Sequence, residues 1–499
     1  MAIPLRTGYE QASYIVYIKD GGYYAKHGRT GDIAFGGPNN MGGVSGSDAA
    51  AVIQAAINAT FAEGGGSVFL KKGNYYLTSA LTLPNTLALG EDKFLQILSD
   101  GAILSVSAAV AADVISLDAV SQVNYSLVLR GFHIYPASRS QSYYGIRIKN
   151  ILNLYIDNVT LGWEGLKVDT CSIVYLSSLY LVDTTNDAIY LTDCSYVFAT
   201  DIFADNVGGY GGVAGYNGIL ISNCNRVFFK TLRLFGQKGS YGGQENGIYI
   251  SNSSYVFFSD VEIDGFKKSH VFIASGGTIL FNNLYAHDGQ NCAIEISATG
   301  PVSNVQVSNF EFTGDALQRG LAIWAQNTHN IRRVRLEGGI IHDLVPGVNY
   351  GVWLSDDGSA NTCYLMVRNV IFRNLTYGIS EGGKSDYNLF ENNVFDSVAT
   401  PIDSLVGGHS YVRRNEGYVT ENRGIAVMAA GGAITVTHHM DAIPVVINVT
   451  AQGDLGDVYV PGGDKITVTG FTIVADTPVA GVSVFWEAYA KSTGMWLFW

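Results

Sequence analysis

The sequence predicts an all-β fold: a right-handed parallel β-helix with an N-terminal helical cap and a C-terminal antiparallel β-sandwich. Three patterns lead to this prediction. A small residue followed by alternating apolar residues recurs along the chain, a polar residue follows it at a fixed distance, and helical periodicity is almost absent between residues 120 and 415. Repeats of short strands are typical of a solenoid in which each repeat forms one coil.

The recurring motif, called the anchor here, begins at ten positions: Gly145, Gly165, Ala188, Gly218, Gly247, His270, Ala293, Ala322, Gly351 and Gly378. The spacings between anchors are 20, 23, 30, 29, 23, 23, 29, 29 and 27 residues. Thirteen residues after each of the first six anchors comes a short polar residue: Asn158, Ser178, Asp201, Thr231, Asp260 and Asn283. This fixed offset predicts rigid strands joined by one variable loop, with the polar residues stacked at a tight bend.

The two ends of the chain depart from the repeat. Ser47 and Asp48 precede apolar residues at helical spacing, and a run of three glycines from Gly64 ends the pattern, which predicts a capping helix. Beyond Tyr418, short alternating strands between glycine-rich turns predict a β-sandwich. The predicted domains are an N-terminal segment with the capping helix, the β-helix, and a sandwich that could serve oligomerisation: 1–65, 66–418 and 419–499.

Composition narrows the possible functions. The chain has 499 residues, of which 47% are apolar and 15% charged, and no apolar run is long enough to cross a bilayer. These values exclude a disordered chain and membrane insertion. With 30 Lys and Arg against 43 Asp and Glu, the net charge of −13 disfavours nucleic acid as a partner.

Cellular context is also constrained. The first residues lack a basic stretch followed by an apolar stretch, so no Sec-type signal is expected in the given sequence. The five cysteines form no CxxC pair, which predicts reduced buried thiols and gives no indication of a metal or another cofactor. An extracellular or virion-associated protein would then need a removed signal or another export route.

Near the N-terminus, a set of motifs resembles a known superfamily. Asp48, the run Val52–Ile57, the triple glycine, Gly73-Asn-Tyr-Tyr and Leu81-Thr-Leu-Pro resemble the N-terminal signature of the pectate-lyase-like β-helix superfamily. That superfamily includes polysaccharide lyases, glycoside hydrolases and phage tailspike depolymerases, so the resemblance implies a β-helix that acts on polysaccharides. It covers about residues 25 to 415.

One branch of the superfamily can be discounted. Polygalacturonase-type hydrolases carry Asn-Thr-Asp-Gly, Asp-Asp and Gly-His-Gly on successive coils. This chain has Asn186-Asp187-Ala188 and Asn217-Gly218 instead, without paired aspartates or Gly-His-Gly. No catalytic residue can therefore be carried over from that branch.

Outward positions of the anchor strands are rich in aromatic residues. The second residue after each anchor should point outward, which predicts a glycan-binding floor formed by Tyr249, Phe272, Trp324 and Trp353. Against a 23-residue coil, the loops before Gly218 and Gly247 are longer by 7 and 6 residues and could form walls. Two alternatives remain, namely the preference of aromatic residues for β surfaces and a contact with another subunit.

Carboxylates and histidines are predicted to line the trough that this floor and these walls would form. The candidate catalytic residues are Glu295, Asp288, Asp264, Asp315 and His287, and His270 and Glu245 are further candidates for substrate binding. Glycoside hydrolysis needs two carboxylates in different protonation states. Glu295 is the predicted acid, because desolvation by Phe272 and Trp324 would keep it protonated. Asp288 or Asp264, at a more solvated turn, would stay charged.

The predicted function is binding and depolymerisation of a polysaccharide by glycoside hydrolase chemistry, as in a tailspike-like protein. A polysaccharide lyase is an alternative, because His270, His287, Lys267 and Lys268 lie in the trough. A non-catalytic glycan-binding or structural virion protein is another, so the enzyme class stays open. The resemblance to tailspikes and the apolar end Met495–Trp499 predict a homotrimer.

Overall fold

The computed structural model is all-β, a β-solenoid of about 11 turns with almost no helix. The chain divides into two compact units, residues 1–295 and 296–499, which are described in turn. The residues that the structure describes are 12–85, 92–136, 143–207, 215–236, 245–325, 330–356, 362–382, 385–403, 410–418, 421–429, 431–438, 440, 444, 446–452, 457–461, 466–467, 469–477 and 480–489.

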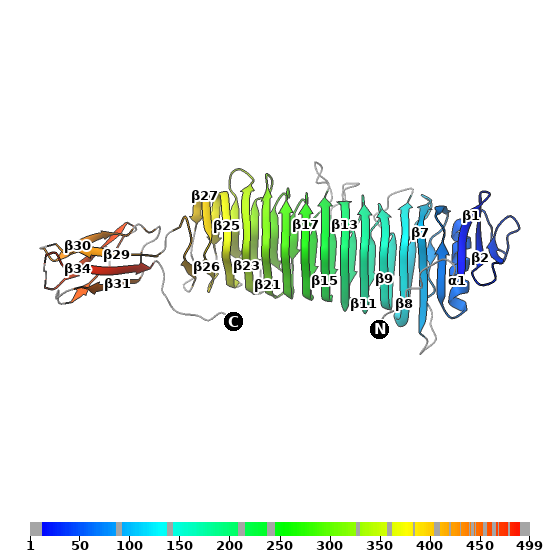
Figure 1. Cartoon of the computed structure of the whole chain (residues 1–499), viewed down its shortest axis with the longest axis horizontal. Coiled ribbons are helices and arrows are strands. Elements are labelled where there is room, and N and C mark those ends of the chain that lie inside the picture. The colour runs from blue at the N-terminus through cyan, green and yellow to red at the C-terminus, as the bar shows by residue number, and fades with distance from the viewer. Residues whose placement is uncertain are drawn as a thin grey trace. The chain divides into compact units, whose positions relative to one another are not determined.

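The first unit begins with a small sheet and one helix and continues as stacked coils (Figure 1). Its opening elements are β1 (Tyr14–Lys19), β2 (Gly22–His27), β3 (Ile33–Gly36), α1 (Ala49–Ala62), β4 (Gly66–Leu70), β5 (Gly73–Leu77) and β6 (Leu81–Thr82). The coils follow as β7 (Lys93–Val106), β8 (Ile115–Pro136), β9 (Ile146–Gly162), β10 (Leu166–Asp169), β11 (Ile173–Val182), β12 (Ile189–Thr192), β13 (Tyr196–Val207), β14 (Ile219–Ser222), β15 (Asn225–Gly236), β16 (Ile248–Ser251), β17 (Ser253–Asp264), β18 (Ser269–Ile273) and β19 (Gly276–His287). The strand β20 (Cys292–Ala298) comes next.

Anchor strands of the first unit stack in parallel, in the predicted register. The short strands β10, β12, β14, β16 and β18 pair one after another. Their first apolar residues form an interior column in which every side chain is fully buried: Ile146, Leu166, Ile189, Ile219, Ile248 and Val271. The apolar residue that follows the anchor therefore points inward in six successive coils, and burial of such side chains drives the stacking.

The long strands bend at the predicted polar column. Asn158, Ser178, Asp201, Thr231, Asp260 and Asn283 all have positive φ, between 51° and 57°. Asn and Asp tolerate this left-handed conformation better than most residues, which explains their use at the bend. The strands β11, β13, β15, β17 and β19 stay paired in register directly on both sides of it, so the bend turns each long strand from one face of the coil to the next.

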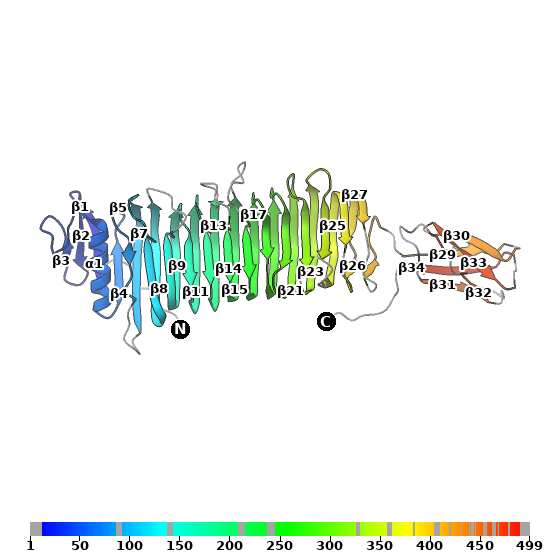
Figure 2. The same cartoon turned by 180° about the vertical axis from the view of Figure 1, so that it is seen from behind.

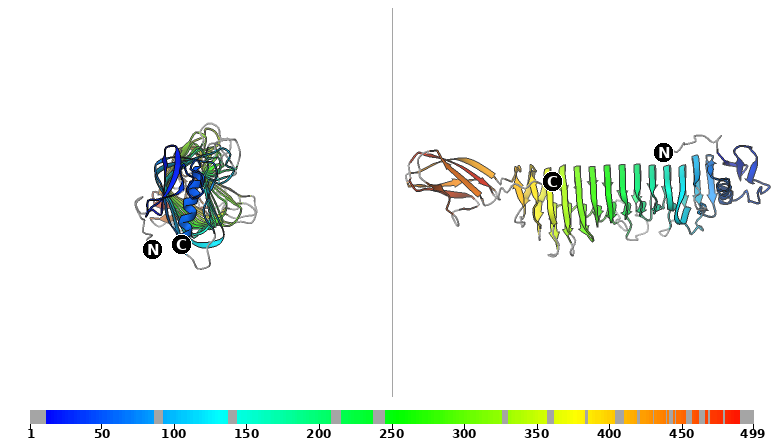
Figure 3. Two further views of the ribbon diagram at one scale, coloured as in Figure 1. Left: turned by 90° about the vertical axis from the view of Figure 1, so that its right-hand side faces the viewer. Right: turned by 90° about the horizontal axis from the view of Figure 1, so that it is seen from below.

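The helix α1 packs beside the first strands of the unit (Figure 2). The side chain of Asp48 accepts a hydrogen bond from the backbone N–H of Ala51, 3.2 Å away, and so caps its first turn. One face, which includes Val52, Ile53 and Ile57, is fully buried. Seen along the coils, α1 and β1 lie in front of the stacked strands of this unit (Figure 3, left).

The second unit continues with parallel coils. Its solenoid strands are β21 (Val302–Gly314), β22 (Arg319–Ala325), β23 (Ile331–Leu344), β24 (Tyr350–Asp356), β25 (Thr362–Glu381), β26 (Leu389–Glu391), β27 (Val394–Ile402) and β28 (Tyr411–Arg413). One predicted anchor is shifted by two residues, because Leu321 pairs with Val352 and Gly320 is therefore the residue equivalent to Gly351. Ala322 is opposite Trp353, which corrects the predicted alignment of Trp324 with Trp353.

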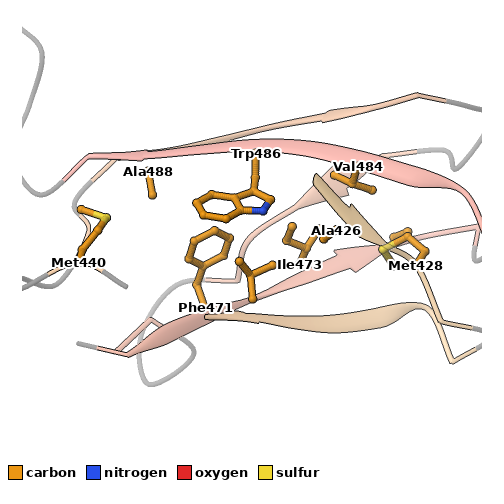
Figure 4. Packing of buried hydrophobic residues seen from close by; sticks show 10 residues of the cluster. Ala426, Met428, Met440, Phe471, Ile473, Val484, Trp486 and Ala488 are labelled. Carbon is orange, nitrogen blue, oxygen red and sulfur yellow. The ribbon is translucent and has the colours of Figure 1, made fainter. Parts of the chain in front are cut away.

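Residues beyond the coils form two three-stranded antiparallel sheets. One contains β29 (Glu421–Val427), β34 (Ser483–Tyr489) and β31 (Val446–Ala451), and the other β30 (Ala433–Thr437), β33 (Gly470–Ala475) and β32 (Val458–Tyr459). Side chains from both sheets share a hydrophobic core in which Phe471 packs edge-on against Trp486 at 5.3 Å (Figure 4). The predicted contact residues 495–499 lie outside the described residues.

Two expectations from composition can be compared with the structure. In the described part of the chain, no helix is long and apolar enough to span a membrane. Cys171, Cys194, Cys224 and Cys292 are buried free thiols, as predicted. The first three lie at equivalent positions of successive coils, where small side chains fit the stacking.

Candidate functional site

One turn of the coil, between the end of each long strand and the next anchor strand, carries four of the eight predicted site residues of the first unit: Glu245, Asp264, His287 and Asp288. We call the outer surface of this turn the turn face. Asp264 ends β17 and His287 ends β19, and the two residues are directly opposite each other in the parallel pairing. Stacking of the coils therefore brings together side chains that are 23 residues apart in the sequence.

Glu295 lies on the outward face of β20 and is partly exposed. Its Oε2 atom accepts hydrogen bonds from Ser269 Oγ at 2.6 Å and from Asn291 Nδ2 at 3.3 Å. Two neutral donors from the turn face thus fix the position of this carboxylate. Sequence analysis predicted aromatic surroundings for Glu295 and did not identify these polar partners.

His287 is surrounded by carboxylates, and this group is called the His287 cluster here. Its Nδ1 atom lies 3.5 Å from Asp264 Oδ1 and 3.5 Å from Asp288 Oδ2, and its Nε2 atom lies 3.8 Å from Glu262 Oε1. The Asp264 side chain is 3% exposed and that of Asp288 is 49% exposed. One carboxylate at the base of the cluster is therefore buried and another is open to solvent.

Burial revises two of the predicted roles. Asp264 is not at a solvated turn, because only 2% of the residue is exposed. His270 is fully buried, and its Nε2 lies 2.8 Å from the carbonyl oxygen of His287. Burial lowers the pKa of His270 to about 4. His270 therefore holds the turn together and has no contact with the surface to which it was assigned.

The predicted binding residues of the first unit lie at the edge of the turn face. The rings of Tyr249 and Phe272 are stacked, with centroids 5.3 Å apart and an interplanar angle of 8°. Each ring covers one face of the other, so only their edges and outer faces remain for a ligand. Glu245 Oε1 forms an ion pair with Lys268 Nζ at 2.7 Å.

The remaining predicted residues belong to the second unit. Trp324 is 42% exposed and meets Trp353 edge-on, with ring centroids 6.2 Å apart. Asp315 lines a cavity of about 400 Å³ together with Asp343 and Asn349. That these residues share a site with Glu295 stays a prediction.

A polar group that sequence analysis did not identify lies on earlier coils of the turn face. Glu164 is 4% exposed, and its Oε2 has no hydrogen-bond partner among the described residues. Burial, followed by the charge of Asp113, raises the pKa of Glu164 to about 8. At the equivalent position of the next coil, burial raises the pKa of Asp187 to about 6. Asp187 Oδ1 accepts the backbone N–H of Asn217 at 2.6 Å.

Cationic and aromatic side chains lie on the same coils as these two carboxyl groups. Arg147 Nη1 lies 3.5 Å from Asp113 Oδ2, and Lys167 Nζ lies 4.4 Å from the ring centroid of Tyr190. The sequence contains one signal for this polar group, namely a polar residue directly before four successive anchors. These residues are Glu164, Asp187, Asn217 and Asn246. Hydrogen bonds between Asn246 and Asn217 and between Asn217 and Asp187 identify this position as a structural side-chain ladder.

Another aromatic row lies on the long strands and was also missed. Neighbouring rings in this row are stacked 4.7 to 5.3 Å apart: Tyr155, Tyr175, Phe198, Phe228 and Phe257. Four of these residues line an apolar cavity of about 570 Å³. The sequence signal for this row was the alternating apolar pattern that follows Cys171, Cys194 and Cys224. That pattern was interpreted only as a β-strand.

Comparison with known proteins identifies the fold. Residues 144–335 match the family described as "Right handed beta helix region". The sequence matches no curated protein.

Several solved structures are similar in fold. Gene product 12 of bacteriophage phi29, in its pre-mature form, has a TM-score of 0.55 and 13% identity, and the match covers 73% of this chain and 54% of that chain. The tailspike protein gp49 of Pseudomonas phage LKA1 has a TM-score of 0.48 and 13% identity, with 88% and 92% covered. The A-module of mannuronan C-5 epimerase AlgE6 of Azotobacter vinelandii has a TM-score of 0.45 and 17% identity, with 74% and 95% covered.

At these identities the similarity concerns the fold alone. The family match agrees with the parallel stacking of the anchor strands. The chain has the right-handed parallel β-helix fold.

Proposed function

We propose that this protein binds a polysaccharide along the turn face and cleaves it by glycoside hydrolysis, with Glu295 as proton donor. The observation that carries the proposal is the arrangement of carboxylates at both edges of one turn. Glu295 is held by Ser269 and Asn291 at one edge, and Asp288 is open to solvent at the other. The stacked rings of Tyr249 and Phe272 adjoin this surface and offer edges for a sugar.

The reaction consumes one water and breaks one glycosidic bond. Glu295 gives its proton to the leaving oxygen, while the carboxylate of Asp288 accepts a proton from the water that attacks the anomeric carbon. Asp264, buried behind His287, positions the imidazole next to Asp288. Glu164 has the raised pKa that a proton donor needs, but it is buried and a glycan could not reach it. Glu295 is partly exposed, so we assign the role of proton donor to Glu295.

A panel of neutral and acidic polysaccharides tests the reaction class. New reducing ends without absorbance from unsaturated uronates would support hydrolysis. Both signals together would support a lyase, for which Lys268 and His287 lie on the same turn face. Retention of a glycan without either signal would support the alternative of a binding protein.

We also propose roles for the two ends of the chain. The helix α1 covers the first coil and so prevents edge-to-edge association of its strands, which is consistent with its buried face against β4 and β5. The two C-terminal sheets form a sandwich that joins three chains into a homotrimer. Their shared core of Phe471 and Trp486 supports an independently stable module. An extracellular or virion-associated location belongs to the same proposal.

A further inference from the structure

The His287 cluster has a geometry that hydrolysis by carboxylates alone does not require. Two carboxylate oxygens, from Asp264 and Asp288, both approach the same ring nitrogen, Nδ1, at 3.5 Å. An imidazole carries at most one proton on that nitrogen, so it can donate to only one of them at a time. Glu262 faces the other ring nitrogen and is also 3.5 Å from Arg233 Nε.

A second histidine of the described residues shows the arrangement expected of a purely structural group. His342 lies two residues before the end of β23 and is followed by an aspartate with positive φ, as His287 is followed by Asp288. Its Nδ1 lies 2.7 Å from Asp343 Oδ2 and its Nε2 lies 3.0 Å from Glu311 Oε1. Each ring nitrogen thus has one carboxylate within hydrogen-bond distance, and the two carboxylates lie on opposite sides of the ring.

At His287 the two aspartates instead approach the same ring nitrogen. Nδ1 and one oxygen each of Asp264 and Asp288 all lie within 4.8 Å of one another. Ligands that bind an ion tetrahedrally at about 2.0 to 2.2 Å lie about 3.3 to 3.6 Å apart. The two distances from Nδ1 are therefore those of ligands around an ion, and they are longer than good hydrogen bonds.

We propose that Asp264, His287 and Asp288 form a binding site for a divalent first-row transition-metal ion. One imidazole and two carboxylates favour Zn²⁺ or Mn²⁺ over Ca²⁺ and Mg²⁺, which prefer oxygen ligands throughout. One of the two carboxyl groups is almost completely buried, and a bound ion would supply the partner that a buried carboxylate needs. Three protein ligands leave at least one position open for water.

The ion site does not depend on the proposed cleavage. Only the role of an ion in that reaction rests on the proposed function. In the proposed hydrolysis, the ion would hold Asp288 and would activate the attacking water, a role that a free carboxylate would otherwise have.

Zn²⁺ binding to the untagged full-length chain, stripped with a chelator, tests the site by calorimetry. The expected result is one ion per chain, with affinity at least tenfold weaker in Asp264→Asn and His287→Gln and unchanged in the matched variant His342→Gln. Co²⁺ should give visible absorption bands of a low-symmetry site that His287→Gln removes. Both losses should occur while the circular dichroism spectrum of the variant remains native.

The half-exposed Asp288 provides a variant that should fold even if Asp264→Asn does not. Asp288→Asn should also weaken Zn²⁺ binding at least tenfold. Absence of Zn²⁺ and Mn²⁺ binding, or equal losses in His287→Gln and His342→Gln, would overturn the proposal. If the protein binds Zn²⁺ but still cleaves the glycan after the ion has been removed with a chelator, the ion site stands and only its role in the reaction is disproved.

Discussion

Single residues at the turns of the coil differ from what their type and spacing predict, and burial is the reason. Glu164 and His270 have ordinary positions in the repeat, yet the packing of adjacent coils excludes water from both. A sequence shows that a residue precedes an anchor, but the depth of the residue depends on the loops and coils on either side. The pKa shifts of Glu164 and His270 could therefore not be predicted from the sequence. Both shifts can be tested by experiment.

Glu164 should make the protein less stable as pH rises. Its folded-state pKa of about 8 lies above the ordinary value of 4.5, so the native chain binds the proton more tightly than the unfolded chain. The stability is fully present below the ordinary pKa and is lost as pH rises toward 8. Glu164→Gln should remove this loss, on the order of 4 kcal/mol between pH 5 and pH 9.

Urea unfolding at both pH values measures the effect. The exposed residue Glu416 provides the control, because Glu416→Gln should leave the pH dependence of the wild-type protein in place. An equally steep loss of stability in Glu164→Gln and in the wild-type protein would show that Glu164 is ionised at neutral pH.

His270 should act at the opposite end of the pH range. Its folded-state pKa of about 4 lies below the ordinary value of 6.5, so its contribution is present above pH 6.5 and is lost as pH falls toward 4. His270→Gln should lose about 1 kcal/mol at pH 7 with the hydrogen bond to His287 and should be less sensitive to acid. Thermal unfolding between pH 7 and pH 4 measures this effect, with His133→Gln as control. An acid sensitivity of His270→Gln equal to that of the wild-type protein would contradict this account.

At the scale of elements, the sequence was sufficient wherever one coil repeats the next. The anchors from Gly145 to His270 and the polar column are in the predicted register, because inward apolar residues and a fixed offset leave one alignment. The shift from Ala322 to Gly320 has a simple cause. Moving a strand by two residues keeps every side chain on the same face, so alternation alone cannot distinguish the two registers.

The candidate site was only partly predictable for a related reason. Carboxylates and His287 on the turn face follow from the coil spacing, and the structure places Asp264, His287 and Asp288 together. Partners such as Ser269 and Asn291 come from different coils and depend on loop conformation. Outward aromatic residues were identified, but their stacking on each other was not.

The bend of the long strands offers a direct test of the turn column. Thr231 has a φ of 55°, which is unfavourable for a β-branched residue, while Asn158 and Asn283 occupy equivalent bends. Thr231→Asn should raise the free energy of unfolding by about 1 kcal/mol. Thr200→Asn, in the regular part of β13, should give no gain, and equal effects of the two substitutions would contradict the explanation.

For the whole molecule, the proposed trimer depends on the C-terminal sheets. A chain that ends at residue 418 should be a monomer by light scattering, whereas the full chain should have three times the mass of one subunit. The circular dichroism of the shortened chain should retain the β signal of the coils, because each coil contacts mainly its neighbours. A full-length monomer, or a shortened chain that stays trimeric, would disprove this role.

The central claim is that the turn face cleaves a polysaccharide with Glu295 as acid. The most direct measurement compares the cleavage and the binding of one substrate glycan in Glu295→Gln and in the control Glu416→Gln. Because glutamine keeps the shape but cannot donate the proton, Glu295→Gln should lose at least a hundredfold in turnover and still bind the glycan. Turnover at the wild-type rate in Glu295→Gln would contradict the account.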